Sequence, residues 1–226
     1  MSPNLTYRHP LAQTTELLLV RHGRTAANRG RIIQGQIDIP LDAFGVLQAE
    51  RAAAEIAHAY APSLLVTSPL SRAVATAEII GKRVGLVPVT HPGLAEMHCG
   101  TCEGVAFSEI VATDPALAAR LQDPDDFDFG WPGGESRRQF HARVRATFDD
   151  ILCRNGSDQI VVVAHGGVIG AFTTMARGVS PGDRDAYDLD NCGITHVALA
   201  PDPEFRAFNA TAHLAGLVDP FSDDSR

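Results

Sequence analysis

The sequence predicts an α/β fold: a three-layer sandwich in which helices cover both faces of a mostly parallel central sheet. Short, continuous apolar runs of strand type recur along the chain, and amphipathic helical patterns separate them. Strands that are apolar on both faces are typical of parallel sheets, because helices bury both sides. Composition agrees, since 45% of the 226 residues are hydrophobic and 20% are charged, which is usual for a globular domain.

The first strand is expected at Leu17–Val20, where four apolar residues follow one another. A helix is expected over Leu41–Tyr60, because apolar residues recur there at helical spacing. Asp42 is well placed to cap its first turn.

A second strand, Leu64–Val66, leads into the next helix. Ser68 and Pro69 predict where this helix begins, with the serine as N-cap and the proline at the first helical position. The helical pattern runs to about Val84.

The second half of the chain continues the alternation. Helices are expected over 136–152 and 167–177, on either side of an apolar strand at 160–164. Two further strands are expected at 194–199 and 204–209.

The whole chain, 1–226, is interpreted as a single domain. The segment 103–130 breaks the alternation and predicts a small helical insertion that lies over one rim of the sheet as a lid. Residues 1–14 and 219–226 are polar and are expected to be loose.

The net charge and the number of cysteines exclude several classes of protein. The formal net charge is −8, which argues against a general nucleic-acid or anionic-membrane binder. No apolar run is long enough to cross a membrane, and no secretory signal is evident. Four cysteines are too few for a disulfide scaffold, so a cytoplasmic location is expected. Homodimers suit sheets of this kind, and the sequence leaves the oligomeric state open.

Three predicted strands end in residues that suit an anion. Arg21, His22 and Gly23 follow the first strand, Arg72 lies in the first turn of the helix after the second, and His165 and Gly166 follow the strand at 160–164. Arginine has a fork that matches phosphate oxygens, histidine can act as a nucleophile, and glycine lets backbone approach a ligand. Each motif alone has a plain structural interpretation: a surface arginine, a capping histidine or a tight turn.

A carboxyl group on a fourth segment favours the anion-binding interpretation of these motifs over the structural one. Glu96, in LAEMHCGTCEG, follows a short apolar run and is expected at the same rim of the sheet, where it could serve as a general acid. By itself it could equally be a surface glutamate. Because parallel strands end at one edge, the four motifs together predict a site for a small anion.

At this point the chain resembles the histidine phosphatase superfamily, the phosphoglycerate-mutase-like proteins. The resemblance covers residues 17–170, in the family order. The stretches that carry it are RHGRTAAN, IQGQIDIPLDAFGVLQA, TSPLSRAVATAE, LAEMHCGTCEG, PGGES and VVAHGG.

The resemblance implies catalysis through a phosphohistidine at His22. It implies that Arg21, Arg72 and His165 hold the phosphate and that Glu96 donates a proton to the leaving group. It also implies that Asn28, Gln34 and Gly35 touch the phosphate or the substrate, with Gly166 leaving room for close approach. No metal or cofactor is expected, because arginines supply the positive charge.

A phosphomonoester hydrolase acting on a small phosphorylated metabolite is the favoured function. The segment MHCGTCEGVAFSEI after Glu96 has no Lys, Arg or Tyr, whereas the mutases of the family carry a basic, tyrosine-containing segment there. A phosphoglycerate-mutase-type transferase and a catalytically silent phospho-ligand binding protein are the alternatives. Sugar phosphates, phosphoglycerate derivatives, phosphoserine and a nucleotide-loop phosphate of cobalamin synthesis all remain open as substrates.

Two further features stay open. Cys99 and Cys102 stand beside His98 and suggest a metal or redox site, but Cys153 and Cys192 stand alone, so apolar filling is the simpler hypothesis. The remaining cations and aromatic residues near the motifs have either a substrate-binding or a structural interpretation: Arg24, Arg29, Arg31, Phe107, Phe127, Phe129 and Trp131.

Overall fold

The computed structural model describes residues 7, 14–155, 159–200 and 202–221. Six strands form one sheet within this part of the chain, in the order β3-β2-β4-β1-β5-β6. Their bounds are β1 Thr15–Arg21, β2 Leu64–Thr67, β3 Val89–Thr90, β4 Gln159–Ala164, β5 Ile194–Leu199 and β6 Pro203–Ala210.

The sheet is mixed, with its parallel part in one block. β3, β2, β4 and β1 pair in parallel, whereas β5 runs antiparallel to β1 and β6 antiparallel to β5. The carboxyl ends of the four parallel strands therefore meet at one edge. β5 begins at that same edge, because Ile194 pairs with Val20 near the end of β1.

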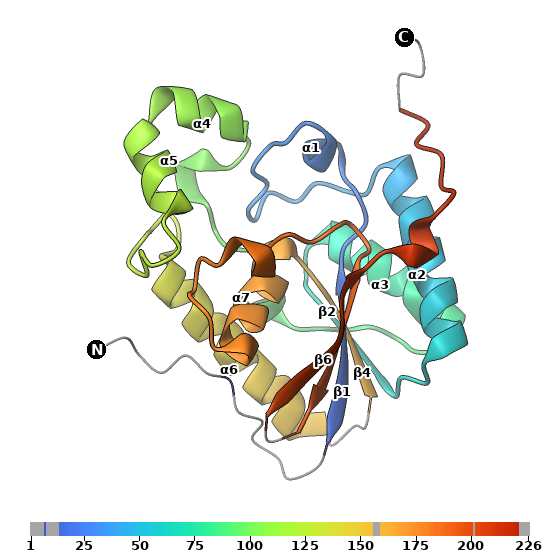
Figure 1. The fold of residues 1–226 in the computed structure, drawn as a ribbon. Coiled ribbons are helices and arrows are strands. Elements are labelled where there is room, and N and C mark those ends of the chain that lie inside the picture. The colour runs from blue at the N-terminus through green and yellow to red at the C-terminus, as the bar shows by residue number, and fades with distance from the viewer. Residues whose placement is uncertain (1–6, 8–13, 156–158, 201, 222–226) are drawn as a thin grey trace.

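Helices cover both faces of the sheet, as the sequence predicts. α2 and α3 lie on one side, and α6 and α7 lie on the other (Figure 1). None of the described helices is both long and apolar enough to cross a membrane. The helix bounds are α1 Ala26–Arg29, α2 Ala43–Ala59, α3 Ser71–Val84, α4 Phe107–Thr113, α5 Pro115–Gln122, α6 Arg137–Asn155 and α7 Gly166–Arg177.

The alternation of side chains along β1 builds both cores. Leu17 and Leu19 pack into the cluster beneath α6 and α7, whereas Leu18 and Val20 pack into the cluster beneath α2 and α3. All four are fully buried. A strand that is apolar on both faces thus holds the two layers together, which accounts for the uninterrupted LLLV run.

The N-cap prediction is right for α2 and wrong for α3. The Asp42 carboxylate accepts a hydrogen bond from Gly45 N, 2.8 Å away. Ser68 is not a cap, because its backbone N–H donates to Val163 O (3.0 Å) and extends the ladder of the sheet beyond β2. The helix begins at Ser71, after an extended Leu70.

The insertion predicted at 103–130 is helical and has a small core of its own. It contains α4 and α5, which lie above the carboxyl edge of the sheet (Figure 1). Ile110 and Phe129 pack there with Trp131 and with the two cysteines of the CxxC pair.

Residues 1–14 and 219–226 are predicted to be loose, but one described residue in each of these segments is held in place. Tyr7 is fully buried, and its backbone N–H donates to Met175 O (2.7 Å). Asp219 pairs with Arg24, which ties the end of the described chain to the loop after β1. Residues 1–6, 8–13 and 222–226 lie outside the described residues.

Replacing Phe148 with alanine should lower the free energy of unfolding by about 3–5 kcal/mol, because the change leaves a cavity in the core. Phe148 is fully buried, and its ring lies 4.2 Å from that of Phe172. Urea denaturation measures the loss. Val87→Ala is the control, since Val87 is 85% exposed and should change stability by less than about 0.5 kcal/mol. Equal losses in the two variants would contradict this account of the core.

Candidate functional site

The strand ends bring the predicted residues together at one edge. β1 and β4 pair in register, with Arg21 opposite Ala164. His22 and His165 therefore follow on neighbouring strands, and the backbone N–H of His22 donates to Ala164 O (2.9 Å). The two imidazole rings lie 5.1 Å apart.

The geometry of His22 exposes one defined ring nitrogen for chemistry. Its Nδ1 lies 2.8 Å from Gly23 O, and since a carbonyl oxygen only accepts, Nδ1 carries the proton. Nε2 of the neutral ring is then free to attack. Burial, and next the cations of Arg21 and Arg72, hold the pKa of His22 well below its usual value.

Three potential donors next to His22 have no hydrogen-bond partner among the described residues. They are Arg21 Nε, Arg72 Nε and His165 Nδ1, and all three atoms are buried. Buried polar groups are nearly always paired, because desolvation without a partner is costly. Three orphaned groups of this kind around one histidine indicate a site shaped for an anion.

Arg72 is held rigidly by backbone rather than by a carboxylate. It is fully buried, and its Nη1 and Nη2 donate to Ile37 O and Gly35 O, both at 2.8 Å. Its charge is therefore not neutralised by a direct salt bridge to a described carboxylate. The two Nη atoms thus fix the orientation of the guanidinium, and its Nε has no partner among the described residues.

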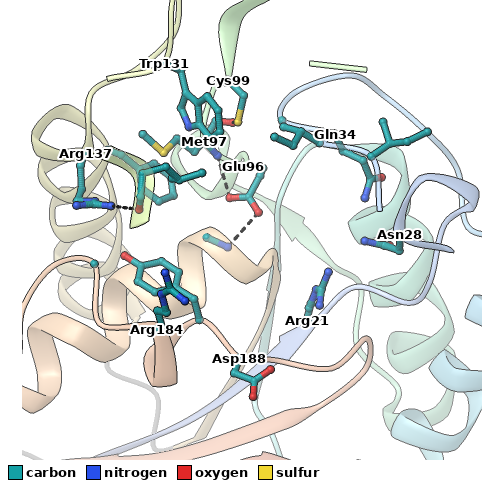
Figure 2. Close-up of a pocket in the computed structure, with 18 of the residues that line it drawn as sticks. Arg21, Asn28, Gln34, Glu96, Met97, Cys99, Trp131, Arg137, Arg184 and Asp188 are labelled. Atoms are coloured by element: carbon teal, nitrogen blue, oxygen red, sulfur yellow. Dashed lines mark hydrogen bonds between the residues drawn. The ribbon is translucent and has the colours of Figure 1, made fainter. Parts of the chain in front are cut away.

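Glu96 lines the same cavity as His22 and lies across it from Arg21 (Figure 2). Its Oε2 accepts from Gly167 N in the first turn of α7 (3.0 Å), and its Oε1 accepts from Met97 N (2.9 Å). A Cβ at residue 167 would lie 2.2 Å from Glu96 Oε1, so any larger residue there would displace the Glu96 carboxyl group from this position. The carboxyl group is thus fixed by two backbone amides.

Asn28, Gln34 and Gly35 also line the cavity, as expected. Asn28 Oδ1 accepts from Thr25 N (3.1 Å), and the amide nitrogen of Asn28 points toward the cavity (Figure 2). Gln34 is buried, with its Oε1 accepting from Thr25 Oγ1 (2.9 Å).

Gly166 and His165 are placed differently from the other predicted site residues. The cavity wall includes Gly167 rather than Gly166. A Cβ at Gly166 would lie 3.6 Å from Arg21 Nε, so this glycine stands beside the arginine. His165 is fully buried and is not among the described residues that line the cavity, and its Nε2 is 2.7 Å from Ser68 Oγ.

The cavity is much larger than a phosphate. Its volume is about 690 Å³, within the range of small-molecule sites. Beyond the histidine and arginines, about half of its described wall is apolar, and Arg184 and Asp188 lie on the side across from Glu96 (Figure 2). The apolar lining residues are Ile32, Ile33, Met97, Leu121, Phe129, Trp131 and Phe140.

Several supporting residues were missed by sequence reasoning. Asn191 Nδ2 donates to His22 O (2.9 Å), and Arg21 Nη1 donates to Leu189 O. Both belong to the loop before β5, which reaches the site because β5 starts at that edge. The turn residues of DLDNCG are the only local signal, and they do not reveal which strand lies next to β1.

The aromatic residues of the insertion divide between two places. Phe129 and Trp131 line the cavity, whereas Phe107 and Phe127 are not among the described residues that do so. Cys99 and Cys102 are buried free thiols, and burial raises the pKa of both. The described residues contain no group of three His, Cys, Asp or Glu side chains arranged to hold a metal ion.

None of Arg24, Arg29 and Arg31 is among the described residues that line the cavity. Arg24 donates from Nε to Asp42 Oδ2 (2.8 Å) and pairs with Asp219. The Arg29 guanidinium lies 4.4 Å from the centre of the Phe221 ring. The first two of these arginines therefore hold the C-terminal segment against the loop after β1.

Comparison with known proteins gives one consistent family. The model of the histidine phosphatase superfamily (branch 1) matches residues 17–211. A glucosyl-3-phosphoglycerate phosphatase of Mycobacterium tuberculosis is 38% identical over 165 residues, which are 70% of this chain and 73% of the relative. A probable phosphoglycerate mutase of Yersinia enterocolitica is 32% identical over 83% of this chain and 86% of its own. The solved phosphoserine phosphatase of Entamoeba histolytica, in complex with 3-phosphoglyceric acid, has a TM-score of 0.77, with 30% identity over 88% of this chain and 99% of its own.

Inorganic phosphate should bind this site and raise the melting temperature of the protein. Arg72→Lys should weaken phosphate binding by about tenfold, because lysine keeps the charge but lacks the Nε–H and the fork. Thermal shift over a phosphate titration measures both. Arg177→Lys is the matched control, since Arg177 stacks on Phe205 and Phe208 and does not line the cavity. Equal phosphate shifts in the two variants would refute the site.

Acid should destabilise the unliganded protein partly through His22. Its folded pKa is lowered, so below the unfolded pKa of about 6.5 the unfolded state binds more protons, and stability falls as pH drops. His22→Asn should remove up to about 1.4 kcal/mol per pH unit from this dependence between about pH 6.5 and the lower folded pKa. Urea denaturation at several pH values measures the slope, with the exposed His58→Asn as control. An unchanged slope in His22→Asn would mean that His22 is not kept neutral.

Proposed function

Because the chain belongs to the histidine phosphatase superfamily, we propose that it hydrolyses phosphomonoesters through a phosphohistidine formed on His22. The observation that carries the proposal is the arrangement around this histidine. A neutral, buried imidazole lies next to three buried donors that have no partner in the described part of the chain, Arg21 Nε, Arg72 Nε and His165 Nδ1. A phosphoryl group fits this arrangement because its oxygens accept hydrogen bonds and its charge offsets the cations.

His22 acts as the nucleophile. Its Nδ1–H is held by Gly23 O, so Nε2 presents a lone pair to phosphorus. The N–P bond forms as the bond to the leaving oxygen breaks, which divides one difficult displacement into two easier steps. The lowered pKa keeps the ring neutral, and hence nucleophilic, near pH 7.

Arg21, Arg72 and His165 bind the phosphoryl oxygens. Phosphoryl transfer depends mainly on positioning and on neutralising the charge of three equatorial oxygens. The Ser68 hydroxyl can donate to His165 Nε2, which places the ring proton on Nδ1, the atom that has no partner among the described residues. Two cations and one neutral donor would then face the phosphoryl group.

Glu96 donates a proton to the leaving oxygen and then takes one from the attacking water. Two backbone amides orient its carboxyl group at the wall of the cavity that also includes His22. Asn28, Gln34 and Gly35, on the loop that follows β1, contact the phosphate or the substrate. Gly166 stands beside Arg21 in the first turn of α7, where an added Cβ would be in ordinary contact with Arg21 Nε.

Hydrolysis is favoured over mutase chemistry. A mutase must protect its phosphohistidine from water and retain a phosphorylated product for a second transfer. The segment after Glu96 has no Lys, Arg or Tyr to hold such a product, and Cys99 and Cys102 from it pack into the core of the insertion. With 3-phosphoglycerate, we expect the protein to release inorganic phosphate rather than form an isomer.

We propose a small phosphorylated metabolite as the substrate, with a leaving group that fills the apolar part of the cavity. Two of the named relatives are a glucosyl-3-phosphoglycerate phosphatase and a phosphoserine phosphatase, and the third is a probable phosphoglycerate mutase, so all three names refer to small phosphomonoesters. A cytoplasmic location, a single domain over 1–226 and a homodimer stay predictions from the sequence.

His22→Ala should lower phosphatase activity on a phosphomonoester panel at least about a thousandfold, because the covalent step is lost. Activity of the wild type should be unaffected by a chelator, since the arginines supply the charge that a metal would otherwise provide. Release of inorganic phosphate is the measurement. His58→Ala, on the exposed face of α2, is the matched control. Activity retained in His22→Ala would refute the phosphohistidine, and activity lost with chelator would refute the arginine-based mechanism.

A further inference from the structure

One arginine on α6 holds the backbone of the segment that carries Glu96. Arg143 Nη1 donates to Gly93 O (2.8 Å) and Ala95 O (2.7 Å), and Nη2 lies 3.2 Å from Glu96 O. Three carbonyls within four residues therefore converge on one guanidinium. Of the three residues whose carbonyls Arg143 binds, Glu96 lines the cavity.

Glu135 completes this arrangement from the other side. It forms a bidentate pair with Arg143, with Nε to Oε1 at 2.8 Å and Nη2 to Oε2 at 2.6 Å. Its Oε2 also accepts from His98 N (2.8 Å). The pair thus holds the chain on both sides of Glu96, at residues 93–96 and at residue 98.

The PGGES turn brings Glu135 into place. Its backbone pairs with the other segment through Glu135 N to His98 O (2.8 Å). A Cβ at Gly134 would lie 2.3 Å from His98 O, so the two backbones approach at a distance that only glycine permits. The turn therefore docks against the segment that carries Glu96, and the glutamate that follows the glycines reaches Arg143.

We infer that Glu135 and Arg143 are positioning residues for the proton-donating step. Together they hold the Glu96 backbone so that its carboxyl group stays on the amides of Met97 and Gly167 and faces the leaving oxygen. Neither residue is among the described residues that line the cavity, so the pair acts through Glu96 and not on the substrate. The inference rests on the proposed role of Glu96.

The leaving group separates this role from a general structural one. An aryl oxygen such as nitrophenolate leaves without protonation, whereas an alkyl oxygen needs the proton donor. kcat/KM reports the steps up to phosphohistidine formation, in which that proton is donated. A defect in positioning Glu96 should therefore lower kcat/KM on alkyl esters selectively, while general loosening should lower it on all esters alike.

The experiment measures kcat/KM on nitrophenyl phosphate, phenyl phosphate and glycerol phosphate for four proteins: wild type, Glu135→Gln, Glu96→Gln and the double variant. Glu135→Gln should lose about tenfold on glycerol phosphate and less than about twofold on nitrophenyl phosphate. Glu96→Gln should lose about a hundredfold or more, with the same selectivity. The double variant should match Glu96→Gln, because both changes remove one function.

Glu16→Gln is the matched control. Glu16 pairs with His196 and Arg206 (both 2.7 Å) at the far end of β1, so the variant loses an ion pair away from the site. Arg143→Lys is a second variant that keeps the charge and loses the fork, and it serves if Glu135→Gln does not fold.

The outcomes distinguish failure of the positioning role of Glu135 from failure of the proton-donating role of Glu96. A uniform loss on all three esters in Glu135→Gln, or the pattern of Glu16→Gln, would overturn the positioning role while leaving Glu96 as proton donor. A uniform loss in Glu96→Gln would instead overturn the proposed role of Glu96. Additive losses in the double variant would show that Glu135 acts independently of Glu96, which also contradicts the inference.

Discussion

The parallel pairing of β1 with β4 is the constraint on which the rest of the site depends. Its register sets Arg21 opposite Ala164, so His22 and His165 follow at the same level on adjacent strands. A slip by one residue would turn every side chain of β1 to the other face of the sheet. Leu17 and Leu19 would then leave one core and Leu18 and Val20 the other. The apolar run of β1 thus fixes where the histidines stand.

The site has an energetic cost that the remainder of the fold offsets. Arg72 is fully buried, and its contacts are backbone carbonyls. Arg21 and Arg72 also lower the pKa of His22, after the larger effect of burial. Burying cations whose Nε atoms have no partner among the described residues is costly, and a dianionic ligand would offset that cost. The two cores, and the backbone carbonyls that grip Arg72, keep the donors in place before any ligand arrives.

Particular residues show how far the sequence could lead. Three strands with evident apolar patterns end in RHG, in SPLSRA and in the HGG of VVVAHGG. The general geometry of parallel sheets therefore predicted that these three motifs lie at one edge. The same local rules failed at Ser68, where Ser-Pro looks like a helix start but the serine extends the sheet and bonds to His165. They also failed to find Asn191, because its position depends on β5 being antiparallel and next to β1.

By itself, the sequence determined the two-sided cores, the order of the longer strands and helices along the chain, and which residue types stand at the strand ends, whereas it did not predict the short elements β3 and α1. It did so because apolar periodicity and strand-end position are local properties that packing preserves. Only the tertiary structure decided which donors lack partners, which nitrogen of His22 is free, and that Arg143 and Glu135 hold the segment of Glu96. Those facts depend on contacts between residues far apart in the chain, and no local pattern specifies them. The stretch RHG placed a histidine beside a cation, and burial by the surrounding layers, followed by the charges of Arg21 and Arg72, lowers the pKa of that histidine.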